Sequence, residues 1–241
     1  MSIQQKINQI SIVIPSKNDE ITLIKNIHDL LIFCEKNVSN FEVIIVVNGS
    51  QEKNIKTLKD YLSEKNLKNF KILKSEIVGK GAAVKMGIKN SNFDHILITD
   101  ADFSVKIDHL INFVDKSFNP LGPFVVGTRK SKGSKVVDTP ITRKLTGFIY
   151  TFLVKALLKI NADDTQCGFK LINKKEFSNV ADFRSTGFSY DIEIFLLAKK
   201  NKIIPIEIPV KYIHEKNSNI NVLSDSKKMF SELFKIRNLY L

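Results

Sequence analysis

Two aspartates separated by one residue, Asp100 and Asp102, come directly after the short apolar segment at residues 95–99. That segment is typical of a buried strand, so its end brings two carboxylates to the edge of a sheet. Magnesium takes oxygen ligands and commonly binds through one or two carboxylates together with substrate phosphates. An aspartate-rich turn is the simpler interpretation, because aspartate hydrogen-bonds its own backbone in turns. The aspartate pair alone does not decide whether this segment is an aspartate-rich turn or a site that binds a metal together with a diphosphate.

Three other polar segments stand at comparable points of the chain. Residues 15–20 follow the first apolar segment, and residues 48–50 follow the second. Residues 79–83, which include Lys80, open a helix-like segment whose first backbone N–H groups we expect to be free for a phosphate. The spacing is neither that of a Walker loop nor that of the G-x-G-x-x-G dinucleotide motif. A tight turn into a helix is the alternative for this segment.

Apolar strand-like segments alternate with amphipathic helix-like segments through the first half of the chain. Such alternation predicts an α/β fold with a mostly parallel, doubly wound sheet flanked by helices. Right-handed crossovers place the carboxyl ends of the strands at one edge, where ligands bind in such sheets. We expect strands at residues 10–14 (ended by Pro15), 41–47, 70–73, 96–99 and 124–127, and helices at 21–35, 55–62, 80–90 and 107–116.

The second half of the chain is less regular. Residues 203–212 form an edge strand at most, because Pro205 and Pro209 interrupt the segment. We expect helices at 143–160, 187–200 and 223–241, and a strand at 167–172. The last helix is amphipathic, so we predict one domain at residues 1–212 and a C-terminal amphipathic extension at residues 213–241.

The composition is that of a globular protein with a sizeable core. The chain has 241 residues, of which 43% are hydrophobic and 26% charged. No segment is long and apolar enough to span a bilayer, and the N-terminus lacks the pattern of a secretory signal. Cys34 and Cys167 are too few for a disulfide framework, and we expect both to be reduced. A cytoplasmic location follows as the expectation.

The formal net charge of +12 allows three kinds of partner: nucleic acid, anionic lipid or phosphorylated small molecules. Lysines are spread over all segments, and no nucleic-acid-binding module is recognisable. We therefore expect no nucleic-acid partner.

Four segments, in this order, resemble the motifs of glycosyltransferase family 2: V-I-P-S-K-N-D-E, V-V-N-G-S, G-K-G-A-A-V-K-M-G and I-T-D-A-D-F-S. The resemblance implies the GT-A fold and a nucleotide-sugar donor. Three later segments resemble the polyprenyl-phosphate sugar synthases of that family, above all the dolichyl-phosphate β-glucosyltransferase subgroup: V-V-G-T-R-K, D-T-Q-C-G-F-K-L-I and F-S-Y-D-I-E-I-F-L-L-A.

The resemblance implies a donor site built from side chains that follow three of the strands. Asp100 and Asp102 would hold Mg²⁺ or Mn²⁺ and the donor diphosphate, and Lys80 would approach the nucleotide or its phosphates. Asn48 stands where the family usually has an aspartate for the uracil edge, which leaves base specificity open, since an amide both donates and accepts. The residues implied to line the base and ribose pocket are Pro15, Ser16, Asn18 and Glu20.

The resemblance also implies an acceptor site. Arg129 and Arg143 map onto two arginines that bind the acceptor phosphate in related mannosyl synthases, and Gln166 lies in the acceptor loop. A polyprenyl phosphate has a second pKa of about 6 and is mostly ionised at neutral pH. It needs cationic positioning rather than a general base. A sugar hydroxyl would need a carboxylate base; Asp164 or Asp191 would then serve, although structural hydrogen bonding is favoured for Asp191.

The helix expected at residues 143–160 is strongly apolar, and its cations fall near one stripe. This pattern is typical of a helix that lies in a membrane interface, and equally of a buried helix with one wet edge. The C-terminal helix allows a membrane contact, packing on the domain, or a contact in a homo-oligomer.

Taken together, the resemblance implies an inverting, metal-dependent glycosyltransferase. It would move a hexose, with glucose as the expected sugar, from a UDP-sugar to a polyprenyl phosphate as a peripheral protein at the cytoplasmic membrane face. The alternative within the family is transfer to a sugar hydroxyl in capsule, O-antigen or other cell-surface glycan synthesis. A nucleic-acid-binding protein and a non-catalytic nucleotide-binding relative are disfavoured, the latter by the intact aspartate pair.

Overall fold

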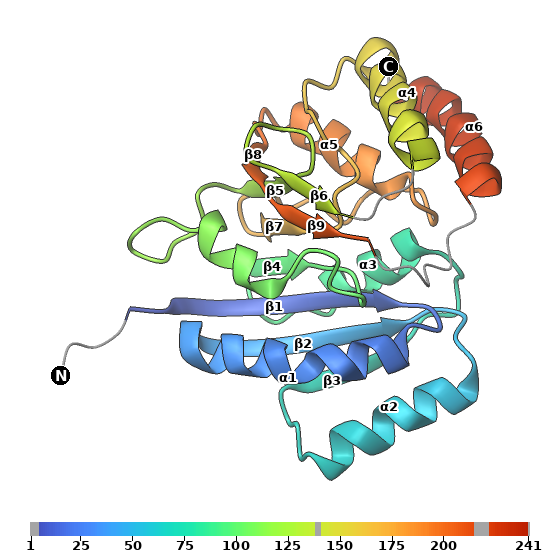
Figure 1. The fold of residues 1–241 in the computed structure, drawn as a ribbon. Coiled ribbons are helices and arrows are strands. Elements are labelled where there is room, and N and C mark those ends of the chain that lie inside the picture. The colour runs from blue at the N-terminus through green and yellow to red at the C-terminus, as the bar shows by residue number, and fades with distance from the viewer. Residues whose placement is uncertain (1–4, 138–140, 215–221, 241) are drawn as a thin grey trace.

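The chain forms a three-layer α/β structure (Figure 1). We analysed a computed structural model that describes residues 5–137, 141–214 and 222–240, with the backbone alone described at 141–146 and 222–230. The strands of the central sheet, in spatial order, are β3 (Phe70–Lys74), β2 (Val38–Val47), β1 (Ile7–Ser16), β4 (His95–Ile98), β7 (Lys170–Asn173), β5 (Phe124–Thr128) and β8 (Ile206–Pro209). A small parallel sheet pairs β6 (Lys135–Val137) with β9 (Lys211–Ile213).

The sheet is parallel except at β7, which runs antiparallel to both of its neighbours, β4 and β5. Ser16 at the end of β1 is level with Val47 at the end of β2. Lys170, the first residue of β7, pairs with Ile98 on one side and Val126 on the other. The carboxyl ends of β1, β2, β4 and β5 therefore meet the amino end of β7 at one side of the sheet, called the carboxyl edge below.

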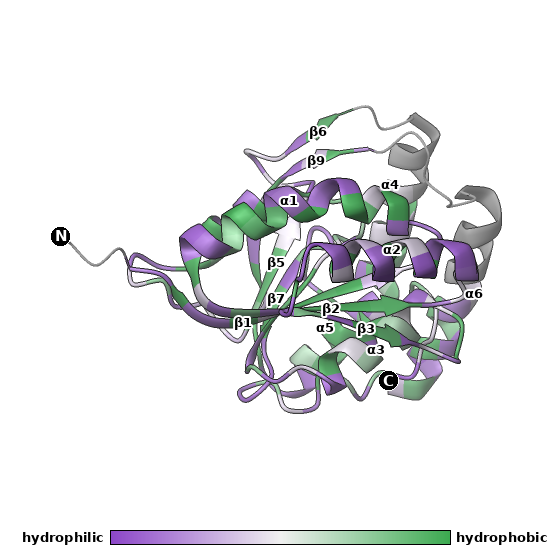
Figure 2. Cartoon of the chain, turned by 90° about the horizontal axis from the view of Figure 1, so that it is seen from below, coloured by the Kyte–Doolittle hydropathy of each residue, from purple (hydrophilic) through white to green (hydrophobic). Residues whose placement is uncertain are grey.

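Helices cover both faces of the sheet (Figures 1 and 2). On β1, Ile12 and Ile14 belong to one hydrophobic core and Val13 to the other, because successive side chains of a strand point to opposite faces. One face carries α1 (Glu20–Asn37), α2 (Glu52–Glu64) and the 3₁₀ helix η1 (Ile107–Phe113); the other carries α3 (Lys80–Lys89), α4 (Ile141–Leu158), α5 (Tyr190–Lys200) and α6 (Val222–Tyr240). The predicted α/β class with a mostly parallel sheet is confirmed.

Several element boundaries differ from those predicted. β1 does not end at Pro15 but continues to Ser16, because a proline removes one donor while its carbonyl can still accept. The α-helix predicted at residues 107–116 is instead the short 3₁₀ helix η1, which ends at Phe113. The strand predicted from residue 167 begins at Lys170, and the helix predicted from residue 187 begins at Tyr190.

The segment predicted as an edge strand at 203–212 divides into two strands. β8 lies at an edge of the main sheet, as predicted, and β9 pairs with β6, which the sequence analysis did not predict. α6 packs against α4, and Leu233 and Ile236 of α6 are buried. None of the described helices is long and apolar enough to cross a bilayer.

Candidate active site

An ion pair between Lys80 and Asp100 lies at the carboxyl edge. Asp100 follows β4, Lys80 is the first residue of α3, and Nζ lies 2.6 Å from Oδ1. The Asp100 carboxylate packs directly on Gly168, where an added Cβ would lie 2.1 Å from Oδ2. A side chain at position 168 would displace the carboxylate, so this glycine is required for Asp100 to take its place.

Asp102 is held in a different way. Its Oδ1 accepts a hydrogen bond from the Ser104 backbone N–H at 2.9 Å, and its Oδ2 accepts one from the Ser104 hydroxyl at 2.6 Å. Burial and the neighbouring Asp100 charge raise the pKa of Asp102. Burial, with Asp102 and Glu20, also raises the pKa of Asp19 to about 6. Neighbouring carboxylates add to the effect of burial in both shifts, so negative charge gathers here, and a bound cation would relieve it.

Asp100 has the opposite shift. Burial, the largest single effect, would raise its pKa, but Lys80 together with Lys170 and Arg129 outweighs burial and lowers it. Asp100 is therefore ionised at neutral pH, and its carboxylate can bind a cation or accept a hydrogen bond.

A second ion pair lies fully inside the protein beneath this edge. Lys170 is 0% exposed, and its Nζ donates to Asp191 Oδ1 at 2.6 Å and to the carbonyl oxygen of Cys167. Its ammonium also lies 5.9 Å from the centroid of the Tyr190 ring. The structural role favoured for Asp191 is confirmed, because its carboxylate neutralises a buried lysine.

The first turn of α3 is not free to bind an anion through its backbone, and this prediction was wrong. Gly81 N–H donates to the carbonyl of Gly187 at 3.2 Å, and Ala82 N–H donates to that of Thr186 at 3.1 Å. Gly79 N–H donates to Asn48 Oδ1. Two segments distant in sequence, at residue 48 and at residues 186–187, thus accept these three N–H groups, and the Lys80 side chain is the group of this turn that can meet a phosphate.

Three of the residues predicted for the base and ribose pocket, Ser16, Asn18 and Glu20, form a network after β1, and Pro15 lies beside them as the last residue but one of that strand. The Ser16 and Ser50 hydroxyls donate to Glu20 Oε1 at 2.9 and 2.5 Å. Asn18 N–H donates to Ser50 Oγ at 3.0 Å. The network fixes the loops after both strands, and the nucleotide-binding roles of these residues stay predictions.

Asn48 holds the turn that precedes α3. Its Nδ2 donates to the Ile77 carbonyl at 2.6 Å, and its Oδ1 accepts from Gly79 N–H. An amide oxygen can accept a second hydrogen bond and an amide nitrogen carries two hydrogens. A contact between Asn48 and a base therefore stays a prediction.

Arg129 follows β5 and forms a forked ion pair with Asp164. Nε and Nη2 lie 2.6 and 2.8 Å from the two carboxylate oxygens, and Arg129 N–H adds a bond at 3.1 Å. The guanidinium also lies 5.2 Å from the centroid of the Tyr212 ring. Nη1 carries two further donors that could meet a phosphate. Asp164 is 1% exposed, and both of its oxygens bind Arg129. Its geometry suits fixing the Arg129 side chain rather than acting as a general base.

The other predicted acceptor residues are placed unequally. Gln166 donates its backbone N–H to Asp164 Oδ1 at 3.3 Å. Arg143 belongs to α4, but its side chain lies outside the described residues. Lys130, next to Arg129, reaches α4 and donates to the Thr151 hydroxyl and to the Gly147 carbonyl. The carboxyl edge is thereby connected to α4.

Acidification should remove the contribution of the Arg129–Asp164 pair to stability. Burial, the largest single effect, would raise the pKa of Asp164, but Arg129 and Lys130 together outweigh burial and lower it from 3.8 to about 2. Because the folded pKa lies below the unfolded one, the stabilisation is complete above about pH 4 and is lost as pH falls towards 2. The shift corresponds to about 2.5 kcal/mol in urea unfolding. In Asp164→Asn this part of the pH dependence should disappear, and an unchanged slope would contradict the assignment.

The sequence analysis missed several residues of this edge. Ser104 could have been found, because a serine two residues after an aspartate commonly bonds its carboxylate. Lys170 had a weaker signal as a lysine inside an apolar segment. Thr186 and Gly187 had none, because their carbonyls act through the backbone.

The acidic groups of the carboxyl edge fit a hard divalent cation. Asp100 and Asp102 offer oxygen atoms, and magnesium and its analogues commonly complete such a pair with water and substrate phosphates. Among the described residues, no group of three or more His, Cys, Asp or Glu side chains forms a complete metal site. A cation held by two carboxylates and completed by the phosphates of the sugar donor agrees both with these oxygen ligands and with the lack of a third such side chain among the described residues.

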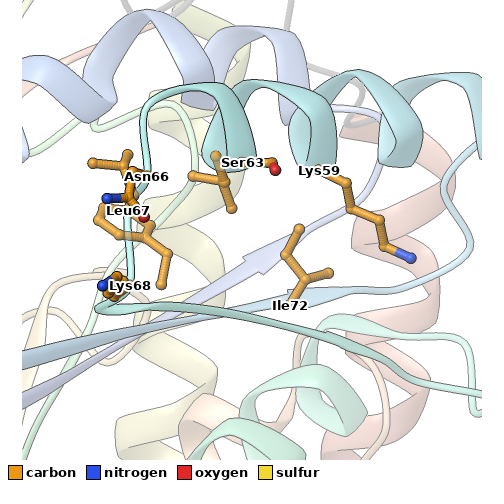
Figure 3. A pocket seen from close by; sticks show the side chains of 8 residues that line it. Lys59, Ser63, Asn66, Leu67, Lys68 and Ile72 are labelled. Carbon is orange, nitrogen blue, oxygen red and sulfur yellow. The ribbon is translucent and has the colours of Figure 1, made fainter.

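A surface pocket of about 340 Å³ lies elsewhere, between α2 and the start of β3 (Figure 3). Lys59 and Ser63 of α2, Leu67 of the following turn and Phe70 at the amino end of β3 are among the residues that line it. The aspartates lie at the opposite, carboxyl ends of the strands, so this pocket does not belong to the site.

Residues 11–180 match the model of glycosyl transferase family 2. The chain belongs to this family. A dolichyl-phosphate beta-glucosyltransferase of Saccharomyces cerevisiae is 30% identical over 96% of the chain and 75% of that protein. Proteins of the same name from Dictyostelium discoideum and Homo sapiens are 27% and 28% identical over 96% and 97% of the chain, and 75% and 76% of their own lengths. This family 2 protein is thus a glycosyltransferase.

Solved structures confirm the GT-A fold for this family 2 glycosyltransferase. Glucosyl-3-phosphoglycerate synthase from Mycobacterium tuberculosis, in complex with uridine diphosphate, superposes with a TM-score of 0.68 at 13% identity, covering 98% of this chain and 81% of that one. The same enzyme in complex with Mn²⁺, UDP and glucosyl-3-phosphoglycerate gives a TM-score of 0.68, covering 97% of this chain and 80% of that one. At this identity the likeness extends to the fold.

Proposed function

We propose that this glycosyltransferase transfers glucose from UDP-glucose to a polyprenyl phosphate, with inversion at the anomeric carbon, at the cytoplasmic face of a membrane. One observation carries the proposal: two acidic side chains and two cations lie at one edge of the sheet. They are Asp100 and Asp102, with Lys80 paired to Asp100 and Arg129 held by Asp164. The names of the relatives from yeast, Dictyostelium and human support the sugar and the class of acceptor.

On the donor side, the acidic pair and Lys80 divide the work. Asp100 and Asp102 would hold Mg²⁺ or Mn²⁺, which when bound neutralises the charge that develops on the leaving diphosphate. Lys80 sits 2.6 Å from Asp100, and its ammonium can shift to a phosphate oxygen without leaving the edge. The network of Ser16, Glu20 and Ser50 keeps the loops after β1 and β2 in place for the nucleoside.

On the acceptor side, the structure favours a phosphate over a sugar hydroxyl. A hydroxyl needs a carboxylate base, and both oxygens of Asp164 are engaged with Arg129. A phosphate brings its own charge and needs a fixed cation. Arg129 is such a cation, because Asp164 and the Tyr212 ring fix its guanidinium.

An apolar surface on α4 supports a contact with the membrane. Phe148 and Phe152 are 70% and 64% exposed, and Ile149 is also exposed. Lys155 lies on the same face, three residues after Phe152, and its ammonium is bound to Asp163 at 2.9 Å. α4 and α6 lie side by side at one end of the molecule (Figure 1). An interfacial helix presents such a face to the acyl chains, while a lysine on that face can extend its ammonium to the level of the headgroups.

Replacing both aromatic residues, Phe148→Ser and Phe152→Ser, should weaken binding to phosphatidylglycerol vesicles by about tenfold or more, because each buried phenylalanine is worth about 1.5–3 kcal/mol. Sedimentation with vesicles measures the change. Ile204→Ser is the matched control, since Ile204 is 83% exposed but lies before β8 and far from α4 in sequence. Equal vesicle binding by all three proteins would contradict a role for α4.

The test of the proposed function is incubation with UDP-[¹⁴C]glucose, Mg²⁺ or Mn²⁺ and undecaprenyl phosphate, followed by lipid extraction. We expect a labelled lipid that releases free glucose after mild acid treatment, and NMR of the intact lipid should show a β linkage to the phosphate. Label in a water-soluble glycan and none in lipid would favour a hydroxyl acceptor. No labelled lipid with any common nucleotide sugar would overturn the proposal.

A further inference from the structure

The turn that carries Lys80 is held by a loop from the far end of the chain. The first N–H groups of a helix lack partners inside the helix. Here Gly81 and Ala82 find partners in the carbonyls of Gly187 and Thr186. The contact is close, because a Cβ on Gly79 would lie 2.2 Å from the Thr186 carbonyl oxygen. A movement of this loop therefore moves the first turn of α3, and Lys80 with it.

The loop itself is held by a buried carboxylate. Glu193 of α5 is 0% exposed, and its two oxygens accept the backbone N–H groups of Arg184 and Ser185 at 2.8 and 2.7 Å. The hydroxyl of Tyr240, the last residue of α6, donates to Glu193 Oε2 at 2.7 Å. The carboxylate thus links the start of the loop to the end of α6.

A second link joins α6 to the end of the same loop. The Ser189 hydroxyl donates to Glu232 Oε2, and Ser189 is the residue before α5. Between the two links, Leu233 and Ile236 of α6 are buried in the core that contains Tyr190. α6 therefore holds the 184–189 loop at both ends.

We propose that α6 is a strap that positions Lys80 against Asp100, with Tyr240 and Glu232 as positioning residues. The order of contacts is α6, the 184–189 loop, the first turn of α3, Lys80 and Asp100. For its effect on catalysis the inference rests on the proposed function, in which Lys80 meets the donor diphosphate. The proposed link between α6 and the first turn of α3 concerns contacts alone, so hydrogen exchange of the backbone amides can test it without any substrate.

Hydrogen exchange is the first measurement. In Tyr240→Phe, loss of a hydrogen bond to a buried carboxylate should make the Gly81 and Ala82 amides exchange about tenfold faster. Tyr61→Phe removes the same atom from α2 and should leave these amides unchanged. If Tyr240→Phe does not melt cooperatively, Glu232→Gln tests the other link with the side-chain volume kept. Unchanged exchange in both folded variants would overturn the strap.

Kinetics supply the second measurement. Tyr240→Phe should raise the KM for UDP-glucose by about fivefold, at the lower end of couplings between linked sites. In a Lys80→Met background, the same change should have no further effect, because its consequence passes through Lys80. Additive effects would show a merely structural role and overturn the positioning. A wild-type protein that transfers no glucose would overturn the proposed function alone, since the exchange result stands without it.

Discussion

Asp102→Asn should reduce glucosyl transfer by about 10³-fold, the scale found when a group that stabilises developing charge is removed. The asparagine can keep one hydrogen bond with Ser104, so the loop should retain its position. What is lost is a negative charge beside Asp100, in a place where burial and like charge raise the pKa of Asp102. Transfer of label to lipid measures the rate.

Mn²⁺ binding, followed by electron paramagnetic resonance without donor or acceptor, separates a lost cation site from a misfolded protein. We expect weaker binding in Asp102→Asn and wild-type binding in Asp94→Asn, because Asp94 is exposed and lies just before β4. Wild-type transfer and wild-type Mn²⁺ binding in a folded Asp102→Asn protein would remove the basis of the donor site.

Asp191→Asn should destabilise the protein by about 3 kcal/mol or more, since it leaves a buried ammonium without its counter-charge. Lys170 is 0% exposed, and Asp191 is the carboxylate to which its Nζ donates, at 2.6 Å. The asparagine offers a carbonyl but no charge. Urea unfolding, monitored by circular dichroism, measures the loss.

Two further variants show whether burial is the cause. In Lys170→Met combined with Asp191→Asn, part of the stability should return, because the unpaired charge is gone. Glu52→Gln breaks a pair with Lys74 in which both side chains are exposed, and no measurable loss is expected. A double variant no more stable than Asp191→Asn alone would contradict this explanation.

The donor residues illustrate how far local pattern reaches. The strand before Asp100, the helix after Gly79 and the polar loops after β1 and β2 are all visible in the spacing of apolar residues. Parallel strands then place their carboxyl ends at one edge, so the meeting of these segments follows from topology. That is why the acidic pair and Lys80 could be assigned to one site.

The hydrogen-bond and ion-pair partners of the site residues could not be predicted from local pattern. The sequence gives no sign that the donors of Gly81 and Ala82 are taken by residues 186–187, or that Asp164 is taken by Arg129. In both cases the partner is far away in sequence, and only the fold brings it to the carboxyl edge. Periodicity describes which face of an element is apolar, and it carries no information on which polar group from elsewhere fills a site.

The amino-acid sequence by itself determined the α/β class, the family, and the carboxylate pair at a strand end, because each depends on neighbours within one element or on an ordered set of motifs. Tertiary structure decided the partners: Lys80 with Asp100, Lys170 with Asp191, and α6 with the loop that caps α3. These depend on burial, which makes an unpaired charge or an unbonded N–H costly and so selects its partner from whatever segment the fold brings near.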